Sequence, residues 1–147
     1  MTDAPRRRWM SVLALATPEE LEAAWRELGA PPPYVRLRGP EIGLVMVRAR
    51  AGGTGLRFNV GETTVTRCAV QLVDGPVGHA WVRGRDVRHA ERAAVLDALL
   101  QDAGRRPELE ASVIEPLAHA REARRRTATA RAAATRVDFF TMVRGED

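Results

Sequence analysis

The chain has 147 residues, of which 45% are hydrophobic and 29% charged, and its 23 basic and 19 acidic residues give a net charge of +4. This length suits a single domain, residues 1–147, with a core of its own. The single cysteine excludes an internal disulfide and any multi-cysteine metal site. No apolar run approaches the roughly 18 residues that span a membrane, and no signal-peptide pattern is present, so we expect a cytoplasmic protein.

All 23 basic residues are arginine. Arginine forks match phosphate oxygens bidentately, so phosphate or nucleic-acid binding is one interpretation. The abundance of arginine together with alanine, glycine and proline is also typical of a high-GC coding bias, which we favour for the composition as a whole. Individual arginines must therefore be judged by their positions in the chain.

Two helices are predicted near the N-terminus. In RRRWMSVLALA (residues 6–16), apolar residues recur every three or four positions, which indicates a short amphipathic helix. Thr17 then provides an N-cap, the following proline suits the first turn, and Glu20 completes a capping box. Gly29 ends this second helix, and a stiff run of three prolines follows it.

The middle of the chain is predicted to be a β-meander. Five short apolar or alternating runs are separated by short connectors, which favour antiparallel neighbours. We expect one face of this sheet to be covered by helices, and the even-numbered residues 66–72 to share one face of their strand. The five predicted strands are residues 34–38, 42–50, 56–60, 63–73 and 77–83.

Two helices and an apolar tail are predicted to follow the sheet. Asp86 can cap a long helix that buries His89 and ends at Gly104. A second helix occupies much of residues 108–135, and Pro116 either kinks it or starts its second part. Its Ala- and Arg-rich end is either solvated or packed on a partner. The expected fold class is therefore α+β: N-terminal helices, a central antiparallel meander of about five strands, two C-terminal helices and an apolar tail.

The stretch RARAGGTGLRF, residues 48–58, combines three glycines with flanking arginines. A nucleotide-binding P-loop needs a lysine after its glycines and a helix beyond, and this stretch has neither. A hairpin turn whose glycines adopt positive φ explains the stretch better. Such a hairpin gathers three candidate anion-binding residues, Arg48, Arg50 and Arg57, unless they pair with Glu62 or solvent.

A fourth anion-binding candidate, Arg85, lies where the last strand leads into a helix N-terminus, whose free N–H groups favour anions. Asp86 would compete with an anion if it caps that helix. His89 is expected to be a polar core residue, and Cys68 to pack in the core. The three histidines share no ligand spacing, so no metal site is expected. No catalytic triad or carboxylate pair is recognisable, and the catalytic residues are unknown.

The C-terminal segment is rich in large apolar side chains. Fully burying each of its two phenylalanines would stabilise the protein by roughly 1.5–3 kcal/mol, so their exposure to water is unfavourable. The segment is therefore either an inner strand or a surface that docks on another subunit. The partner-docking candidates are Val137, Phe139, Phe140, Met142 and Val143.

Five blocks of the sequence, in order and along nearly the whole chain, carry a resemblance to a known family. They are residues 9–14, 43–58, 66–72, 78–99 and 136–145. These blocks resemble the PhnG family, subunits of the bacterial phosphonate carbon–phosphorus lyase system. The stretch after Pro116 matches least well, and Cys68 stands where a small residue is expected, so neither receives a role from the resemblance.

The resemblance implies a small subunit of a hetero-oligomer with PhnI-, PhnH- and PhnJ-like subunits and a PhnL-like ATPase. Such proteins support the synthesis of α-D-ribose 1-methylphosphonate 5-triphosphate from ATP and methylphosphonate, with release of adenine. ATP is a substrate of the complex, and no cofactor is expected on this chain alone. An iron–sulfur cluster and S-adenosylmethionine (SAM) are expected on the PhnJ-like partner. A helper subunit of this kind would position anions and partners and carry no nucleophile.

The alternative hypothesis is an arginine-rich nucleic-acid-binding module. The chain has only seven aromatic residues, three Trp, one Tyr and three Phe. None of them is interleaved with the arginine clusters, as a stacking platform for bases would require. We therefore rank nucleic-acid binding well behind a role in phosphonate processing.

Overall fold

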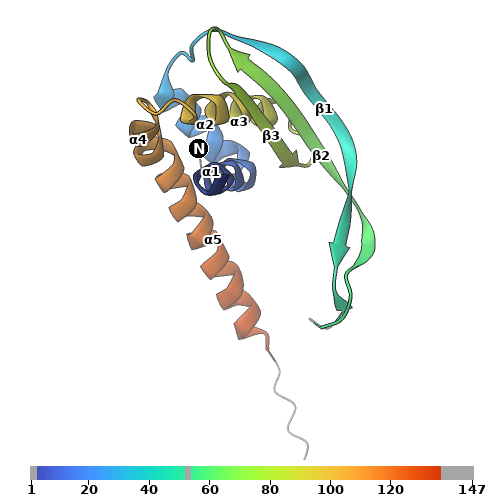
Figure 1. Cartoon of the computed structure of the whole chain (residues 1–147). Coiled ribbons are helices and arrows are strands. Elements are labelled where there is room, and N and C mark those ends of the chain that lie inside the picture. The colour runs from blue at the N-terminus through green and yellow to red at the C-terminus, as the bar shows by residue number, and fades with distance from the viewer. Residues whose placement is uncertain (1–2, 52–53, 137–147) are drawn as a thin grey trace, which may run out of the picture.

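Three antiparallel strands and a set of helices make up the structure (Figure 1). The computed structural model describes residues 3–51 and 54–136. The predicted α+β class is confirmed, whereas the apolar tail with Val137, Phe139, Phe140, Met142 and Val143 lies outside the described residues. The elements are α1 (Asp3–Leu15), α2 (Pro18–Leu28), β1 (Tyr34–Ala49), β2 (Phe58–Leu72), β3 (Val77–Arg83), α3 (Val87–Leu100), α4 (Arg106–Leu109), the π-helical turn η2 (Glu110–Ile114) and α5 (Glu115–Ala134).

The prediction of about five strands is wrong, because the described residues form three long strands in the order β1-β2-β3. Gly39 and Pro40 do not end β1. The register with β2 shifts between Arg36 and Arg38 and again between Arg38 and Glu41, which accommodates the proline. Since β1 is an edge strand, the missing N–H of Pro40 costs little there.

The third and fourth predicted strands are likewise one continuous strand, β2. Gly61 lies opposite Val47, and Glu62 lies opposite Met46, so pairing with β1 continues through the presumed break. The expected alternation is confirmed in the second half of β2, where residues 66, 68, 70 and 72 are buried. Residues 61 and 62, expected to connect two strands, are therefore part of β2.

The helix starts follow the predicted capping chemistry. The Thr17 hydroxyl accepts a hydrogen bond from the N–H of Glu20 at 3.2 Å, and the Glu20 carboxylate accepts one from the N–H of Thr17 at 2.9 Å. Gly29 ends α2 with a φ of 76°. Asp86 caps α3 by accepting from the N–H of His89 at 2.9 Å. These local signals are thus confirmed.

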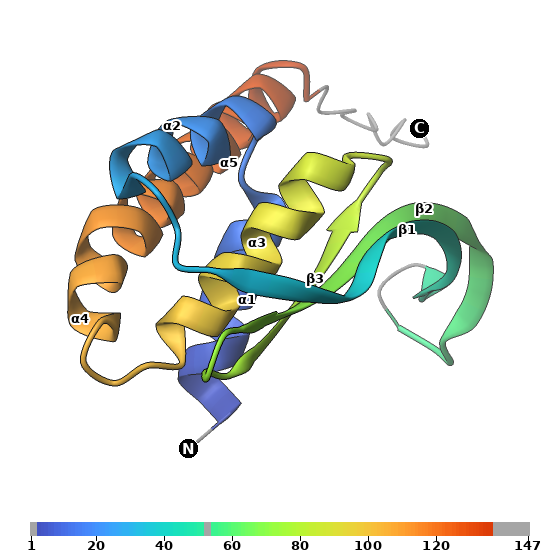
Figure 2. The same ribbon diagram turned by 90° about the horizontal axis from the view of Figure 1, so that it is seen from above.

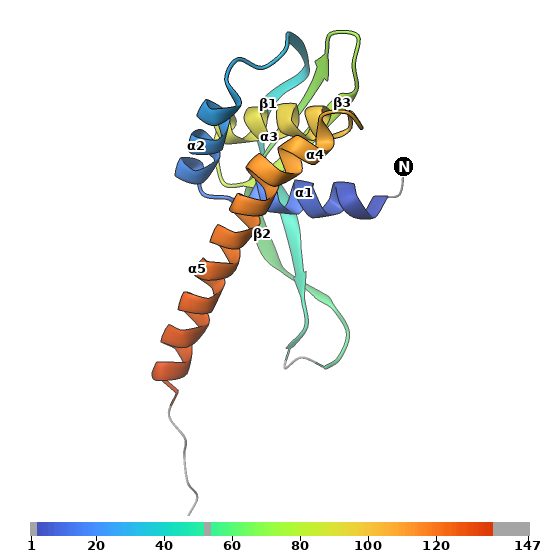
Figure 3. The ribbon, with the colours of Figure 1, turned by 90° about the vertical axis from the view of Figure 1, so that its left-hand side faces the viewer.

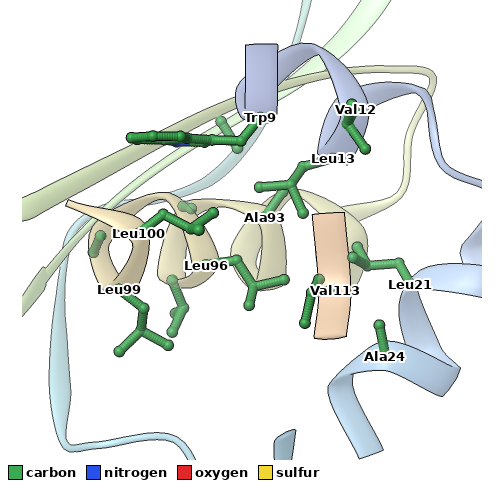
Figure 4. Packing of buried hydrophobic residues seen from close by; sticks show 14 of the residues in the cluster. Trp9, Val12, Leu13, Leu21, Ala24, Ala93, Leu96, Leu99, Leu100 and Val113 are labelled. Atoms are coloured by element: carbon green, nitrogen blue, oxygen red, sulfur yellow. The ribbon is translucent and has the colours of Figure 1, made fainter. Parts of the chain in front are cut away.

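The core is built around α3, which contacts all three strands and also packs against α1 and α2 (Figure 2). Every residue from Ala93 to Leu100 is buried, so this helix has no solvent-facing side along that stretch. Leu13 of α1 lies beside Ala93 in Figure 4. On the sheet side, Gly78 lets β3 approach α3 so closely that an added Cβ would lie 1.9 Å from the carbonyl oxygen of Ala94.

The C-terminal helices follow one continuous helical path from Arg106 to Ala134. The turn before Pro116 widens into the π-helical η2, where the N–H of Glu115 bonds to the carbonyl of Glu110. Pro116 then stands in the first turn of α5, so it starts the second part of the helix, one of the two predicted outcomes. The arginine-rich end of α5 is exposed from Arg125 onwards and projects away from the other helices (Figure 3).

Candidate functional site: the arginine-tipped arm and the open sheet face

Beyond Glu41, β1 and β2 leave the helical body as a two-stranded hairpin (Figures 1 and 3). We name its described residues, 42–51 and 54–64, the arm. β3 pairs with β2 only from Val65 to Gln71, so among the described strands none accompanies the arm as a third. Most side chains of the arm are exposed, and the exceptions, Val45, Thr63 and Thr64, are half-buried.

The tip of the arm carries three of the predicted anion-binding residues. Arg48 lies opposite Asn59 and Ala49 opposite Phe58, so Arg50 and Arg57 follow at the same end of the hairpin. All three arginines are exposed, and none forms an ion pair with Glu62 or with any other described residue. Gly55 has a φ of 101°, as the hairpin interpretation requires.

The fourth candidate, Arg85, lies elsewhere. It stands between β3 and α3, and the nearby Arg83 pairs with Val65. Val65 and Asn59 are six positions apart in β2, a distance of roughly 20 Å along the strand. Asp86 occupies the N–H of His89 at the helix start, which disfavours an anion there. The structure therefore does not bring Arg85 together with the arm arginines.

A row of three side chains crosses the face of the sheet opposite α3. Arg67 of β2 pairs with Glu41 of β1 and with Trp81 of β3 in the strand register. Its guanidinium donates to the Glu41 carboxylate at 3.1 Å and lies 5.6 Å from the centre of the Trp81 ring. Trp81 is 51% exposed. Sequence reasoning missed this row, since only the register brings the three residues together.

Glu91 ties β1 to α3. Its carboxylate accepts hydrogen bonds from the Tyr34 hydroxyl at 2.9 Å and from the Arg36 guanidinium at 2.7 and 3.0 Å. Burial alone would raise the pKa of Glu91, but the bonds from Arg36 and Tyr34 outweigh it and hold that pKa below its usual value. Burial, followed by the bond to Glu91, raises the pKa of Tyr34. This cluster fastens the base of the hairpin to the helical body.

Asp97 is fully buried in α3 and joins three parts of the fold. Its carboxylate accepts from the Arg6 guanidinium at 3.1 and 2.8 Å, from the indole N–H of Trp9 at 2.8 Å and from the backbone N–H of His79 at 2.8 Å. A buried charge is tolerable when it is paired and hydrogen-bonded in this way. The acid inside the apolar run AVLDALL was a signal for this cluster that the sequence analysis overlooked.

Two further predicted residues have structural roles. His89 is buried, and its ring Nε2 donates to the carbonyl of Leu13 at 2.7 Å, so the core assignment is confirmed. Cys68 is also buried, as expected; its thiol donates to the Arg38 carbonyl at 3.4 Å, and burial raises its pKa. Within residues 3–51 and 54–136, no three His, Cys, Asp or Glu side chains group as a metal site would require, and no helix is both long and apolar enough to cross a bilayer.

These features define a small α+β protein that presents an arginine-tipped arm and an open sheet face. The family described as "phosphonate metabolism protein PhnG" matches residues 4–145 of the chain. The α-D-ribose 1-methylphosphonate 5-triphosphate synthase subunit PhnG of Rhizobium meliloti (strain 1021) is 49% identical over 144 residues, which cover 98% of the chain and 92% of the relative. The chain belongs to the PhnG family, as the five resembling blocks indicated.

Proposed function

We propose that the chain is a subunit of an α-D-ribose 1-methylphosphonate 5-triphosphate synthase in organic phosphonate catabolism. The 49% identity to a synthase subunit over nearly all of both chains carries this proposal. In the reaction, an oxygen of methylphosphonate forms a bond to ribose C1′ of ATP while the bond from C1′ to adenine breaks. Adenine leaves with the electron pair of that bond and takes up a proton.

The role that we assign to the chain is structural and anion-positioning, without a catalytic group of its own. The buried polar side chains of the described residues, Thr66, His89 and Asp97, are engaged in hydrogen bonds within the fold. The proposed partners are PhnI-, PhnH- and PhnJ-like subunits and a PhnL-like ATPase in the cytoplasm. The nucleosidase-like chemistry falls mainly to the PhnI-like subunit, and an iron–sulfur cluster and SAM belong to the PhnJ-like subunit.

The arm arginines are the proposed contacts for the anionic substrate. Guanidinium groups bind phosphate oxygens bidentately and stay charged at all physiological pH values. Arg48, Arg50 and Arg57 lie at one end of one hairpin and have no described ion-pair partner, so their donors are available to a triphosphate or phosphonate. Arg85 is a separate candidate because of its distance from the tip.

The proposal is tested by co-expressing the synthase subunits with and without this chain and measuring adenine release from ATP in the presence of methylphosphonate. We expect release to depend on the chain and to return when the purified chain is added back. A full rate without the chain would refute the proposal. Deleting residues 136–147 tests whether the apolar C-terminal segment docks on a partner. If it does, the shortened chain should no longer co-purify with the PhnI-like subunit.

The arginine assignment needs its own variants. Changing Arg48, Arg50 or Arg57 to Gln should raise the KM for ATP or methylphosphonate by roughly 10- to 100-fold each, the range expected for a lost charged hydrogen bond. Assembly should be unchanged. Arg85→Gln serves as the spatially separate comparison, and its effect should combine additively with theirs. Normal kinetics in all four variants would leave the chain with a structural role alone.

A further inference from the structure

The arm exposes an unusual share of the large apolar side chains. Thirteen such side chains are exposed in the part of the chain that the structure describes, and seven of them lie on the arm. Leu44 is 64% exposed and Leu56 94%. The seven are Ile42, Leu44, Met46, Val47, Leu56, Phe58 and Val60.

These side chains occupy both faces of the hairpin. Leu44 pairs with Thr64 and Met46 with Glu62 on the face that continues the buried side of β2, whereas Val47 pairs with Gly61 on the opposite face. The backbone is open as well. Among residues 3–51 and 54–136, β1 is an edge strand and β2 has no second neighbour before Val65. The arm therefore offers two apolar faces and two unpaired edges.

A hairpin of this kind is poorly suited to water. An isolated two-stranded ribbon is marginally stable at best, and exposed apolar edge strands favour association. A contiguous apolar surface on a folded protein marks an interaction site. The arm has 21 described residues, 10 in residues 42–51 and 11 in residues 54–64, which matches the 20–30 residues that each side contributes to a standard protein interface.

We propose that the arm docks in an apolar groove on another subunit of the synthase, with its tip directed at the anionic substrate that this subunit holds. The inference rests on the proposed function. The apolar flanks supply the contact with the walls of the groove, and the unpaired edges supply backbone hydrogen bonds. The three arginines then lie at the far end of the groove, where the triphosphate provides the opposite charge.

Charge favours a different subunit over a second copy of this chain. The arm carries three arginines and one acid, Glu62, so its net charge is 3 − 1 = +2. Two paired arms would bring together six arginines and two glutamates. Glu41 at the base is already bonded to Arg67. Like charges that face each other across an interface are costly, and a groove that ends at an anion has no such cost.

The test uses the synthase subunits with this chain added back. The arm variant replaces Leu44, Met46, Phe58 and Val60 with Thr, which suits a strand but removes the large apolar groups. We expect its Kd for the remaining subunits to rise by roughly 100-fold or more, as for lost interface hot spots. The matched control replaces Val73 and Val87, which are 57% and 45% exposed outside the arm, with Thr and should bind as the unchanged chain does.

Hydrogen exchange of the unchanged chain provides a second readout that needs no variant. Backbone amides of the arm should exchange quickly in the free chain and become protected in the complex. Equal exchange in both states, or an arm variant that binds with unchanged Kd, would overturn the inference and leave the proposed function intact. Failure of the unchanged chain to join the other subunits would instead refute the proposed function. A free chain that dimerises through the arm would assign the arm to a second copy and also overturn the inference.

Discussion

The helical body and the arm share the same two strands but hold their side chains in opposite environments. Along β2, residues 66, 68, 70 and 72 are buried against the helices, whereas residues 58–62 are exposed throughout. β2 pairs with β1 in both parts, and the ladder between them has register shifts in the body and in the arm. The difference shows that strand pairing alone does not make a core. In the body, apolar side chains of β2 are buried against helices of the same chain. In the arm, the apolar side chains are exposed to solvent.

The arginines differ in the same way. In the body, Arg92 bonds to Glu22 and stacks on Trp25, and the bond from Arg92 is the main cause that lowers the pKa of Glu22. Arg124 likewise joins α5 to Glu20 at the start of α2. The arm arginines have no such partners among the described residues. One residue type therefore fastens helices in one region and remains available for binding in the other.

The largest difference in stability between the body and the arm is expected when a buried acid and an exposed acid are each replaced with alanine. Asp97→Ala leaves the Arg6 guanidinium and the Trp9 indole N–H without their acceptor, which should lower the free energy of unfolding by about 3–5 kcal/mol. Glu62→Ala on the arm should change it by less than about 0.5 kcal/mol. Urea denaturation of both variants measures the difference. Similar losses would mean that the arm is as tightly integrated as the body.

A leucine comparison sharpens the same contrast. Leu96 is fully buried in α3, so Leu96→Ala should cost about 2–5 kcal/mol through lost burial and the cavity that remains. Leu44→Ala should cost less than about 1 kcal/mol in the free chain, because this side chain is 64% exposed. Thermal unfolding of the two variants provides the measurement. A large loss for Leu44→Ala would show that the arm is already covered in the free chain.

Two strand glycines give a test of packing space. An added Cβ at Gly78 would meet the Ala94 carbonyl oxygen at 1.9 Å and the Ala98 backbone nitrogen at 2.6 Å, whereas one at Gly43 meets nothing within 4 Å. Gly78→Ala should therefore destabilise by about 1–3 kcal/mol or more, since β3 must move away from α3. Gly43→Ala should be nearly neutral. Chemical denaturation should rank the two, and equal stability would contradict the close approach of β3 to α3.

The smallest effect concerns pH and the base of the hairpin. The pKa of Glu91 is lowered in the folded state, so its stabilisation is present above the unfolded value of about 4.3 and disappears as the pH falls through the folded value. Glu91→Gln should cost about 1 kcal/mol at pH 7, because Arg36 is largely exposed. The difference should shrink at pH 3. Denaturation of the unchanged chain and of the Glu91→Gln variant at both pH values tests this. If the two differ in unfolding free energy by the same amount at pH 7 and pH 3, ionisation of the Glu91 carboxylate is not the cause.

The features that the sequence predicted correctly are local ones. Thr17, Glu20 and Asp86 cap their helices through partners three residues away, so a short window contains the whole interaction. The strand count failed because Pro40 is tolerated only through the edge position of β1 and its register shifts. The residues next to Pro40 in the sequence do not indicate that β1 lies at the edge of the sheet.

The candidate site shows the same limit. The turn glycines located the tip with Arg48, Arg50 and Arg57, because a hairpin is a local structure. The Arg67–Trp81 contact depends on strand register, and the partners of Asp97 lie up to 91 residues away in the chain. The apolar residues of the arm follow the pattern of a buried strand, so the sequence could not show that none of the described helices covers them.

The continuity of β2 has a mechanical consequence. Its first residues form the arm and its last residues fill the core, and a shift of one residue would turn Cys68 and Val70 away from α3. The hairpin therefore cannot slide along itself to adjust its length to a binding surface. The arm can change direction only by bending. Within the arm, the pairing of β1 with β2 has a register shift between Val47 and Arg48, and irregularities of this kind bend a strand. The register of β2 therefore fixes how far the arm reaches from the helical body.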